Sequence, residues 1–104
     1  VTGATRYALL PDVPTVSESG IKELRGFESI AWNGALVAAG TPRPLVERIN
    51  RAVNMALSEP AVRARLKAAG LDVAGGTPEQ FGKRIADESA KWAPVIKATG
   101  ARLD

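Results

Sequence analysis

Over residues 1–30 the hydrophobic positions follow no regular period, because Gly, Pro and Ser interrupt them repeatedly. Residues 7–10 form a short apolar run that Pro11 ends. Residues 14–20 favour one short helix, since Pro stands at its start and Gly at its end. Residues 21–25 are mostly polar and predict a surface loop. We therefore expect loops and one short helix in this part of the chain.

Residues 29–39 differ, because apolar residues follow one another there almost without interruption. Glycines flank the stretch, and Pro42 follows shortly after it. A continuous apolar run between turn signals is typical of a strand buried on both faces, as in a parallel sheet. An alanine-rich helix is the competing interpretation, and Asn33 and Gly34 count against it. We expect a buried strand over this stretch.

A four-residue spacing of apolar positions follows and predicts an amphipathic helix. The residues that share its apolar face are Leu45, Ile49, Val53 and Leu57. We expect Thr41 to cap this helix and Pro42 to occupy its first position. Residues 58–60 break the pattern and begin a second helix, which Gly70 ends. The apolar positions of the second helix are Val62, Leu66 and Ala69.

Residues 71–74 alternate in polarity and suit a short strand, and two glycines then form a turn. Thr77 and Gln80 have the spacing of a capping box, which predicts the start of a long helix. One face of this helix carries Phe81, Ile85, Ser89, Trp92 and Ile96.

The predicted fold class is α/β, with mostly helices packed on one or two buried strands. We expect Phe81 and Trp92 to lie in the core. Pro94 should kink the last helix near Ala90, and Gly100 should end it. So little sheet cannot close a parallel α/β domain. The predicted strand therefore needs neighbours from a larger protein or from another copy of the chain.

Composition narrows the function. The 104 residues are 45% hydrophobic and 24% charged, which is typical of a globular protein. A net charge of +3 comes from dispersed basic residues, so we expect no nucleic-acid partner. The chain contains no Cys and no His, and Asp87 and Glu88 are adjacent on a helix and point in different directions. We therefore expect no catalytic residue, no metal site, no cofactor and no enzymatic activity.

Trp32 and Asn33 are the candidate ligand-binding residues. An aromatic ring and an amide at the start of a buried strand can line a cleft at the end of a sheet. The alternative is that Trp32 is a core residue and that Asn33 satisfies a backbone group.

Residues 10–20, with the sequence LPDVPTVSESG, resemble the signature of the Bug-type solute-binding receptors of tripartite tricarboxylate transporters. The similarity continues in order through the motifs GFE at 26–28, AWNG at 31–34, AGTP at 39–42 and GTPE at 76–79. The loop at 21–25 is slightly longer than in the family, and Ala38 stands where the family often has Pro.

The resemblance implies two α/β lobes joined by crossing strands, with a small carboxylate held in the cleft by backbone amides and ordered water. Residues 1–28 would end the second lobe and form the crossover or hinge segment. Residues 29–104 would be the C-terminal part of the first lobe, with a strand and three helices. Trp32 and Asn33 match positions near the cleft and hinge.

The implied function is periplasmic capture of a small carboxylate for the membrane permease subunits of a tripartite tricarboxylate transporter. This chain resembles the final third of such a receptor. The alternative is a small self-associating interaction domain with no ligand site of its own, because an incomplete sheet has edges that invite pairing.

Overall fold

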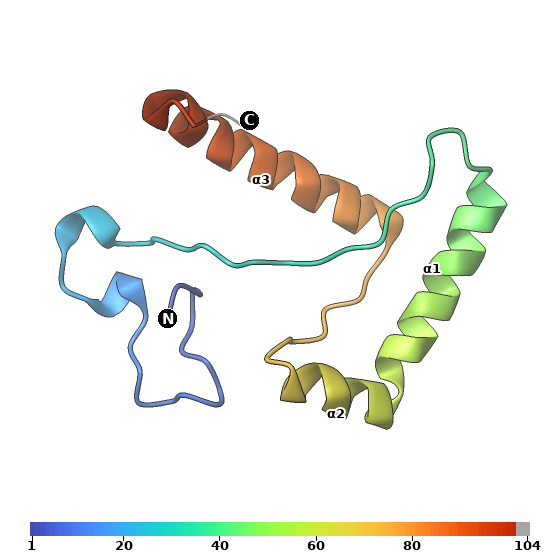
Figure 1. Ribbon diagram of the computed structural model, residues 1–104, viewed down its shortest axis with the longest axis horizontal. Coiled ribbons are helices and arrows are strands. Elements are labelled where there is room, and N and C mark those ends of the chain that lie inside the picture. Colours follow the sequence, from blue (N-terminus) through green and yellow to red (C-terminus); the bar gives the residue numbers. More distant parts are fainter. Residues whose placement is uncertain (102–104) are drawn as a thin grey trace. The chain divides into compact units, whose positions relative to one another are not determined.

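The computed structural model describes residues 1–101, which form two short 3₁₀ helices followed by three α-helices (Figure 1). The chain divides into two compact units, Val1–Gly34 and Ala35–Asp104. The end of the predicted 29–104 range, residues 102–104, lies outside the described residues.

The first unit consists of turns held by backbone hydrogen bonds. The amide of Val16 donates to the carbonyl of Val1 (2.8 Å), and the amide of Ser29 donates to that of Thr2 (2.9 Å). The short helix predicted over residues 14–20 is one 3₁₀ helix, η1 (Val16–Glu18). A second, η2 (Lys22–Leu24), lies in the segment predicted as a surface loop.

Neither predicted strand forms within residues 1–101, so the expected sheet is absent from the described structure. Residues 27–38, which include most of the predicted strand at 29–39, have no regular secondary structure, and neither have residues 71–74. A strand is stable only when another backbone satisfies its amides and carbonyls. An apolar run specifies a strand's surroundings but cannot supply that partner. The buried strands of the predicted fold are therefore absent from these residues, whereas its mostly helical character is confirmed by the three α-helices.

Helix α1 (Arg43–Ser58) begins one residue later than predicted, with Pro42 at its N-cap. The predicted cap, Thr41, instead donates its hydroxyl to the carbonyl of Ala38 at 2.8 Å. With Thr41 as the cap, the third helical residue would be Pro44, which has no amide hydrogen to offer. Only the Arg43 amide would then remain as a donor to such a cap, and the prediction that Thr41 caps the helix is wrong.

Helix α2 (Pro60–Ala68) ends as predicted at Gly70. The Gly70 amide donates to the carbonyl of Lys67 at 3.0 Å, and the Leu71 amide donates to that of Leu66 at 2.9 Å. These two bonds are a Schellman motif, which needs a left-handed residue at the position of Gly70. Its φ of +77° meets that need.

Helix α3 (Pro78–Thr99) begins with the predicted capping box and ends at Gly100. The Thr77 hydroxyl accepts a bond from the Gln80 amide (3.2 Å), and the Gln80 side chain accepts one from the Thr77 amide (2.9 Å). The helix continues through Pro94. The bend near Ala90 stays a prediction.

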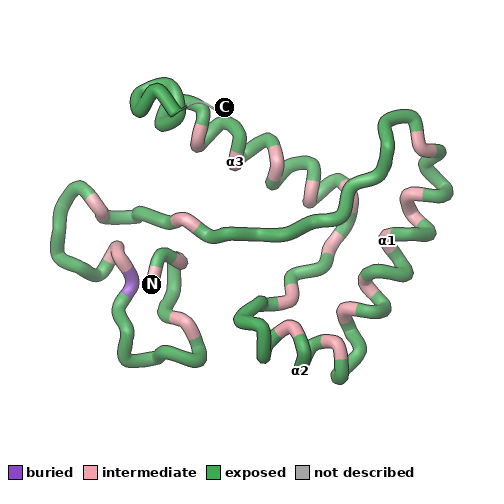
Figure 2. Tube along the Cα trace, viewed as in Figure 1, coloured by how far each residue is buried: buried purple, intermediate pink, exposed green. Residues whose placement is uncertain are grey.

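No hydrophobic side chain of residues 1–101 is fully buried (Figure 2). The buried residue is Thr15, which is 4% exposed. Phe81 and Trp92 are half-buried, so the prediction that they form a core is wrong for this structure. Helix α1 contacts both α2 and α3, but these contacts leave many large apolar side chains exposed.

Candidate functional site

Trp32 and Asn33 lie in the irregular segment at residues 27–38, within the first unit. Trp32 is 37% exposed, and Asn33 is also exposed. Neither lines the hollow described below. Their role in ligand binding stays a prediction.

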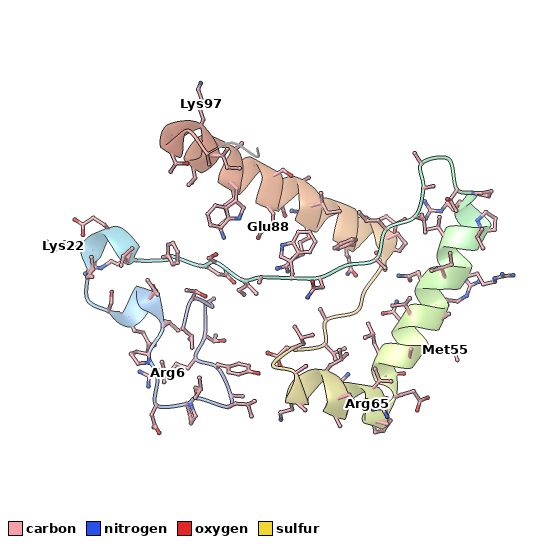
Figure 3. The ribbon with its side chains drawn as sticks, in the orientation of Figure 1. Arg6, Lys22, Met55, Arg65, Glu88 and Lys97 are labelled. Atoms are coloured by element: carbon pink, nitrogen blue, oxygen red, sulfur yellow. The ribbon has the colours of Figure 1, made fainter. Side chains whose placement is uncertain are left out.

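Arg6 and Glu18 form the main charged pair of the first unit; Arg6 is labelled in Figure 3. The Arg6 Nη2 donates to Glu18 Oε1 at 3.0 Å, and its Nε lies 3.1 Å from Oε2. The Thr15 amide donates to the same carboxylate at 2.7 Å. These bonds, with that from Arg6 the largest cause, lower the pKa of Glu18 to about 2.

The same pairing raises the pKa of Arg6 above its usual value. Its Nη1 also donates to the carbonyl of Pro11, at 3.3 Å. Because Glu18 already neutralises this guanidinium, an incoming carboxylate would have to displace an internal one. Arg6 therefore stabilises the turns of the first unit and is poorly placed to bind a ligand anion.

The Tyr7 hydroxyl oxygen has no access to solvent and no hydrogen-bond partner among residues 1–101. Most buried hydroxyls in native proteins find a partner in protein or ordered water. The first unit thus contains one buried hydroxyl, that of Tyr7, whose hydrogen bonding is unsatisfied within residues 1–101.

In the second unit, two asparagines of α1 hold the turn that precedes α3. Asn50 Nδ2 and Asn54 Nδ2 each donate to the carbonyl of Gly76 at 2.9 Å. The Gly76 amide donates to Asn54 Oδ1, also at 2.9 Å. Asn54 therefore satisfies both backbone groups of Gly76, which fixes the start of α3 against the middle of α1.

A second link joins the first turns of α1 and α3. Arg43 bonds Glu47 through Nε at 2.9 Å and Glu79 through Nη2 at 2.7 Å. The pKa of Arg43 is raised, mainly by its bond with Glu47. The pKa of Glu79 is lowered, first by a bond from its own backbone amide and then by Thr77 and Arg43.

Beside this link lies a hollow of about 170 Å³. It is lined by Thr41, Arg43, Val46, Glu47, Pro78 and Glu79. It is smaller than the roughly 300–1,000 Å³ of ordinary ligand pockets. Its one basic residue is already paired with two carboxylates. The hollow is therefore poorly suited to a carboxylate ligand.

Residues 1–101 contain neither a cluster of metal-binding side chains nor a membrane-spanning helix. No group of three acidic, His or Cys side chains there is arranged to hold a metal ion. None of the helices up to residue 101 combines the length and hydropathy of a membrane-spanning segment.

Sequence reasoning missed the polar clusters. A Thr–x–x–Glu spacing, from Thr15 to Glu18, was available as the signal of a capping box. Asn50 and Asn54, four residues apart beside an apolar stripe, were a weaker signal of a polar contact on the packed side of a helix. The partner of this pair, Gly76, could not be named from local spacing.

Comparison with known proteins gives one family. The model of the tripartite tricarboxylate transporter family receptors matches residues 1–101. A relative from a Pseudomonas strain, the UPF0065 protein in the tcbD-tcbE intergenic region, is 40% identical over 96 residues, covering 92% of this chain and 28% of the relative. The protein BugT of Bordetella pertussis is 34% identical over 103 residues, covering 99% of this chain and 31% of BugT.

A third relative, from Agrobacterium vitis, is the UPF0065 protein in the TAR-I ttuE-ttuC′ intergenic region. It is 35% identical, and the match covers 96% of this chain and 29% of the relative. The chain thus spans less than a third of the length of these three relatives. No solved structure gives a significant match.

The matched family consists of receptors, which agrees with the prediction that the chain is not an enzyme. The match extends over both compact units and all three α-helices. The chain therefore belongs to the receptor family of the tripartite tricarboxylate transporters.

Proposed function

We propose that this chain forms part of a periplasmic receptor that captures a small carboxylate and delivers it to the permease subunits of a tripartite tricarboxylate transporter. The observation that carries the proposal is the family match over residues 1–101. In this proposal residues 1–28 belong to the second lobe and the hinge, and residues 29–104 to the first lobe.

The charge pairing in both units favours one mode of ligand binding. Arg6 is neutralised by Glu18, and Arg43 by Glu47 and Glu79. These two arginines already have internal carboxylate partners, so the proposal assigns the ligand contact to a neutral donor. The Asn33 amide is such a donor, and the Trp32 ring is a flat apolar wall beside it.

The test uses a receptor-length chimera in which this chain replaces the matching part of BugT. Isothermal titration calorimetry with mono-, di- and tricarboxylates should give saturable binding of at least one of them and no turnover. Absence of binding across the panel would contradict the proposal.

Asn33→Asp tests the donor role in the same chimera. A carboxylate facing a bound carboxylate repels it and cannot donate, so affinity should fall by about tenfold or more, since losing one buried charge-assisted hydrogen bond costs roughly 1.5–3 kcal/mol. Ala61→Asp is the control, because it adds the same charge at an exposed position in the first turn of α2. Equal affinities for both variants would remove Asn33 from the site.

Self-association is the second candidate function, and the exposed apolar side chains of the described residues favour it. Light scattering on the 104-residue chain distinguishes it: a stable dimer supports self-association, and a monomer at all concentrations opposes it.

A further inference from the structure

Helix α1 has two distinct faces. One face carries Val46, Asn50, Asn54 and Leu57, all half-buried. Its two asparagines bind Gly76, so it is the face that α1 turns toward the rest of the second unit. The other is the apolar stripe, which we define as Leu45, Ile49 and Val53; these side chains are 39%, 37% and 40% exposed.

The two faces are offset by one residue in sequence, which is about 100° around the helix axis. Turning the apolar stripe toward the rest of the unit would therefore rotate Asn50 and Asn54 away from Gly76 and break their three hydrogen bonds to it. The asparagine contacts thus fix the rotation of α1 with the apolar stripe outward.

Sequence around the stripe supports a role in burial. Ala52 and Ala56 lie beside it on the helix surface and widen it, and no charged residue of α1 falls within it. The charged residues Arg48 and Arg51 lie on the far side from the asparagine face. An aliphatic stripe of this width is typical of a helix face that packs against an apolar surface.

We propose that the apolar stripe of α1 is the docking surface for an aliphatic surface on the portion of a family receptor that this chain does not match. The inference rests on the proposed function, which makes this chain part of such a receptor. About 70% of each of the three relatives described above lies outside the match, since the match covers 28%, 31% and 29% of them. That portion is large enough to contribute the missing surface.

A second copy of the chain fits the stripe less well. Three partly exposed aliphatic side chains can bury only roughly a few hundred Å² between two copies, well under the 1,200–2,000 Å² typical of a stable interface. Packing within one receptor does not carry the entropic cost of bringing two molecules together, so a small patch suffices there.

The test is cysteine protection in the BugT chimera of the preceding subsection. The chain itself has no Cys, and any cysteine in the BugT portion is replaced by serine. Ile49→Cys and Val53→Cys place a single thiol on the stripe. Met55→Cys is the matched control, because Met55 lies on the same helix (Figure 3). It is off the stripe and 69% exposed. Each variant is treated with a maleimide reagent, both as the isolated chain and as the chimera.

In the isolated chain all three thiols should react at similar rates. In the chimera the thiols at 49 and 53 should react at no more than about one tenth of their rate in the isolated chain, because labelling then requires local opening. The thiol at 55 should stay reactive. Equal rates at all three positions in the chimera would overturn the proposal. Protection at 49 already in the isolated chain, with a dimer by light scattering, would overturn it in favour of a second copy.

A parallel chimera with the Pseudomonas relative controls for the case in which the BugT portion does not fit this chain. Failure of both chimeras to fold would also overturn the proposal. Ligand titration of the same samples separates the two claims. Protection without carboxylate binding supports the docking surface and contradicts the proposed function. Carboxylate binding with an unprotected thiol at 49 supports the proposed function and contradicts the docking surface.

Discussion

The Glu18 carboxylate accepts hydrogen bonds from Arg6 and from the Thr15 amide, and these bonds lower its pKa from 4.5 to about 2. A lowered pKa in the folded state means that folding favours the ionised form. The stabilising contribution is therefore present above pH 4.5 and is lost as the pH falls from there toward 2. The turns of the first unit should consequently hold at neutral pH and loosen in acid.

This titration is directly measurable. In the BugT chimera, NMR of ¹³C-labelled Glu side chains should give a Glu18 midpoint near pH 2. Arg6→Gln removes the principal cause and should raise that midpoint toward the ordinary value. Lys83→Gln is the control, since its partner is Asp87 and not Glu18. A midpoint near 4.5 in the unsubstituted protein would contradict the Arg6–Glu18 pairing.

Asn54 bonds both backbone groups of Gly76, so its loss should destabilise the second unit. Asn54→Ala leaves both backbone groups of Gly76 without this partner, and we expect a loss of about 1–3 kcal/mol in the free energy of unfolding of the chimera. Met55→Ala is the neighbouring control and should change it by less than about 0.5 kcal/mol. Urea unfolding measures both variants. Equal effects would show that the asparagine contacts contribute nothing to stability.

Among the elements, two glycines allow a matched comparison of backbone strain and crowding. Gly70 (φ +77°) and Gly75 (φ +68°) are both left-handed. A Cβ at Gly70 would meet nothing within 4 Å, whereas one at Gly75 would lie 2.7 Å from Asn54 Oδ1. Gly75→Ala therefore combines the conformational strain with displacement of the Asn54 side chain.

We expect Gly70→Ala to lower the free energy of unfolding by about 1–2 kcal/mol, which is the penalty for an alanine in the left-handed conformation. Gly75→Ala should cost about 1 kcal/mol more, because a hydrogen bond to Gly76 is also disturbed. Thermal unfolding of the two chimera variants gives the comparison. The same loss in both would mean that Asn54 moves aside freely.

The helices could be predicted because their signals are local. Pro60, Gly70 and the Thr77–Gln80 capping box each lie within a few residues of the boundary that they set. The absence of a strand at 29–39 could not be predicted, because strand pairing depends on a distant backbone that an apolar run does not identify. The asparagine contacts were also beyond local reasoning, since Asn50 and Gly76 are 26 residues apart. Trp32 and Asn33 depend on a cleft that local patterns cannot describe.

For the molecule as a whole, the main physical fact is that no hydrophobic side chain of residues 1–101 is fully buried. Burial of apolar surface is the dominant favourable contribution to folding. The 104-residue chain alone should therefore keep helical far-ultraviolet circular dichroism but lack a cooperative thermal transition. Near-ultraviolet signals from its two tryptophans should be weak. A sharp transition in a monomeric sample would contradict this expectation, and the chimera should show such a transition.

The irregular stretch at residues 29–39 has a further consequence for the separated chain. It contains no charged residue and no proline, and Ile30, Leu36 and Val37 are exposed. Uncharged segments of this kind readily stack into intermolecular cross-β aggregates when nothing covers them. Aggregation of the isolated chain should thus begin at this stretch and set the concentration at which it can be stored. Leu36→Lys should raise that concentration, as turbidity measurements would show, since one charge inside such a segment opposes stacking.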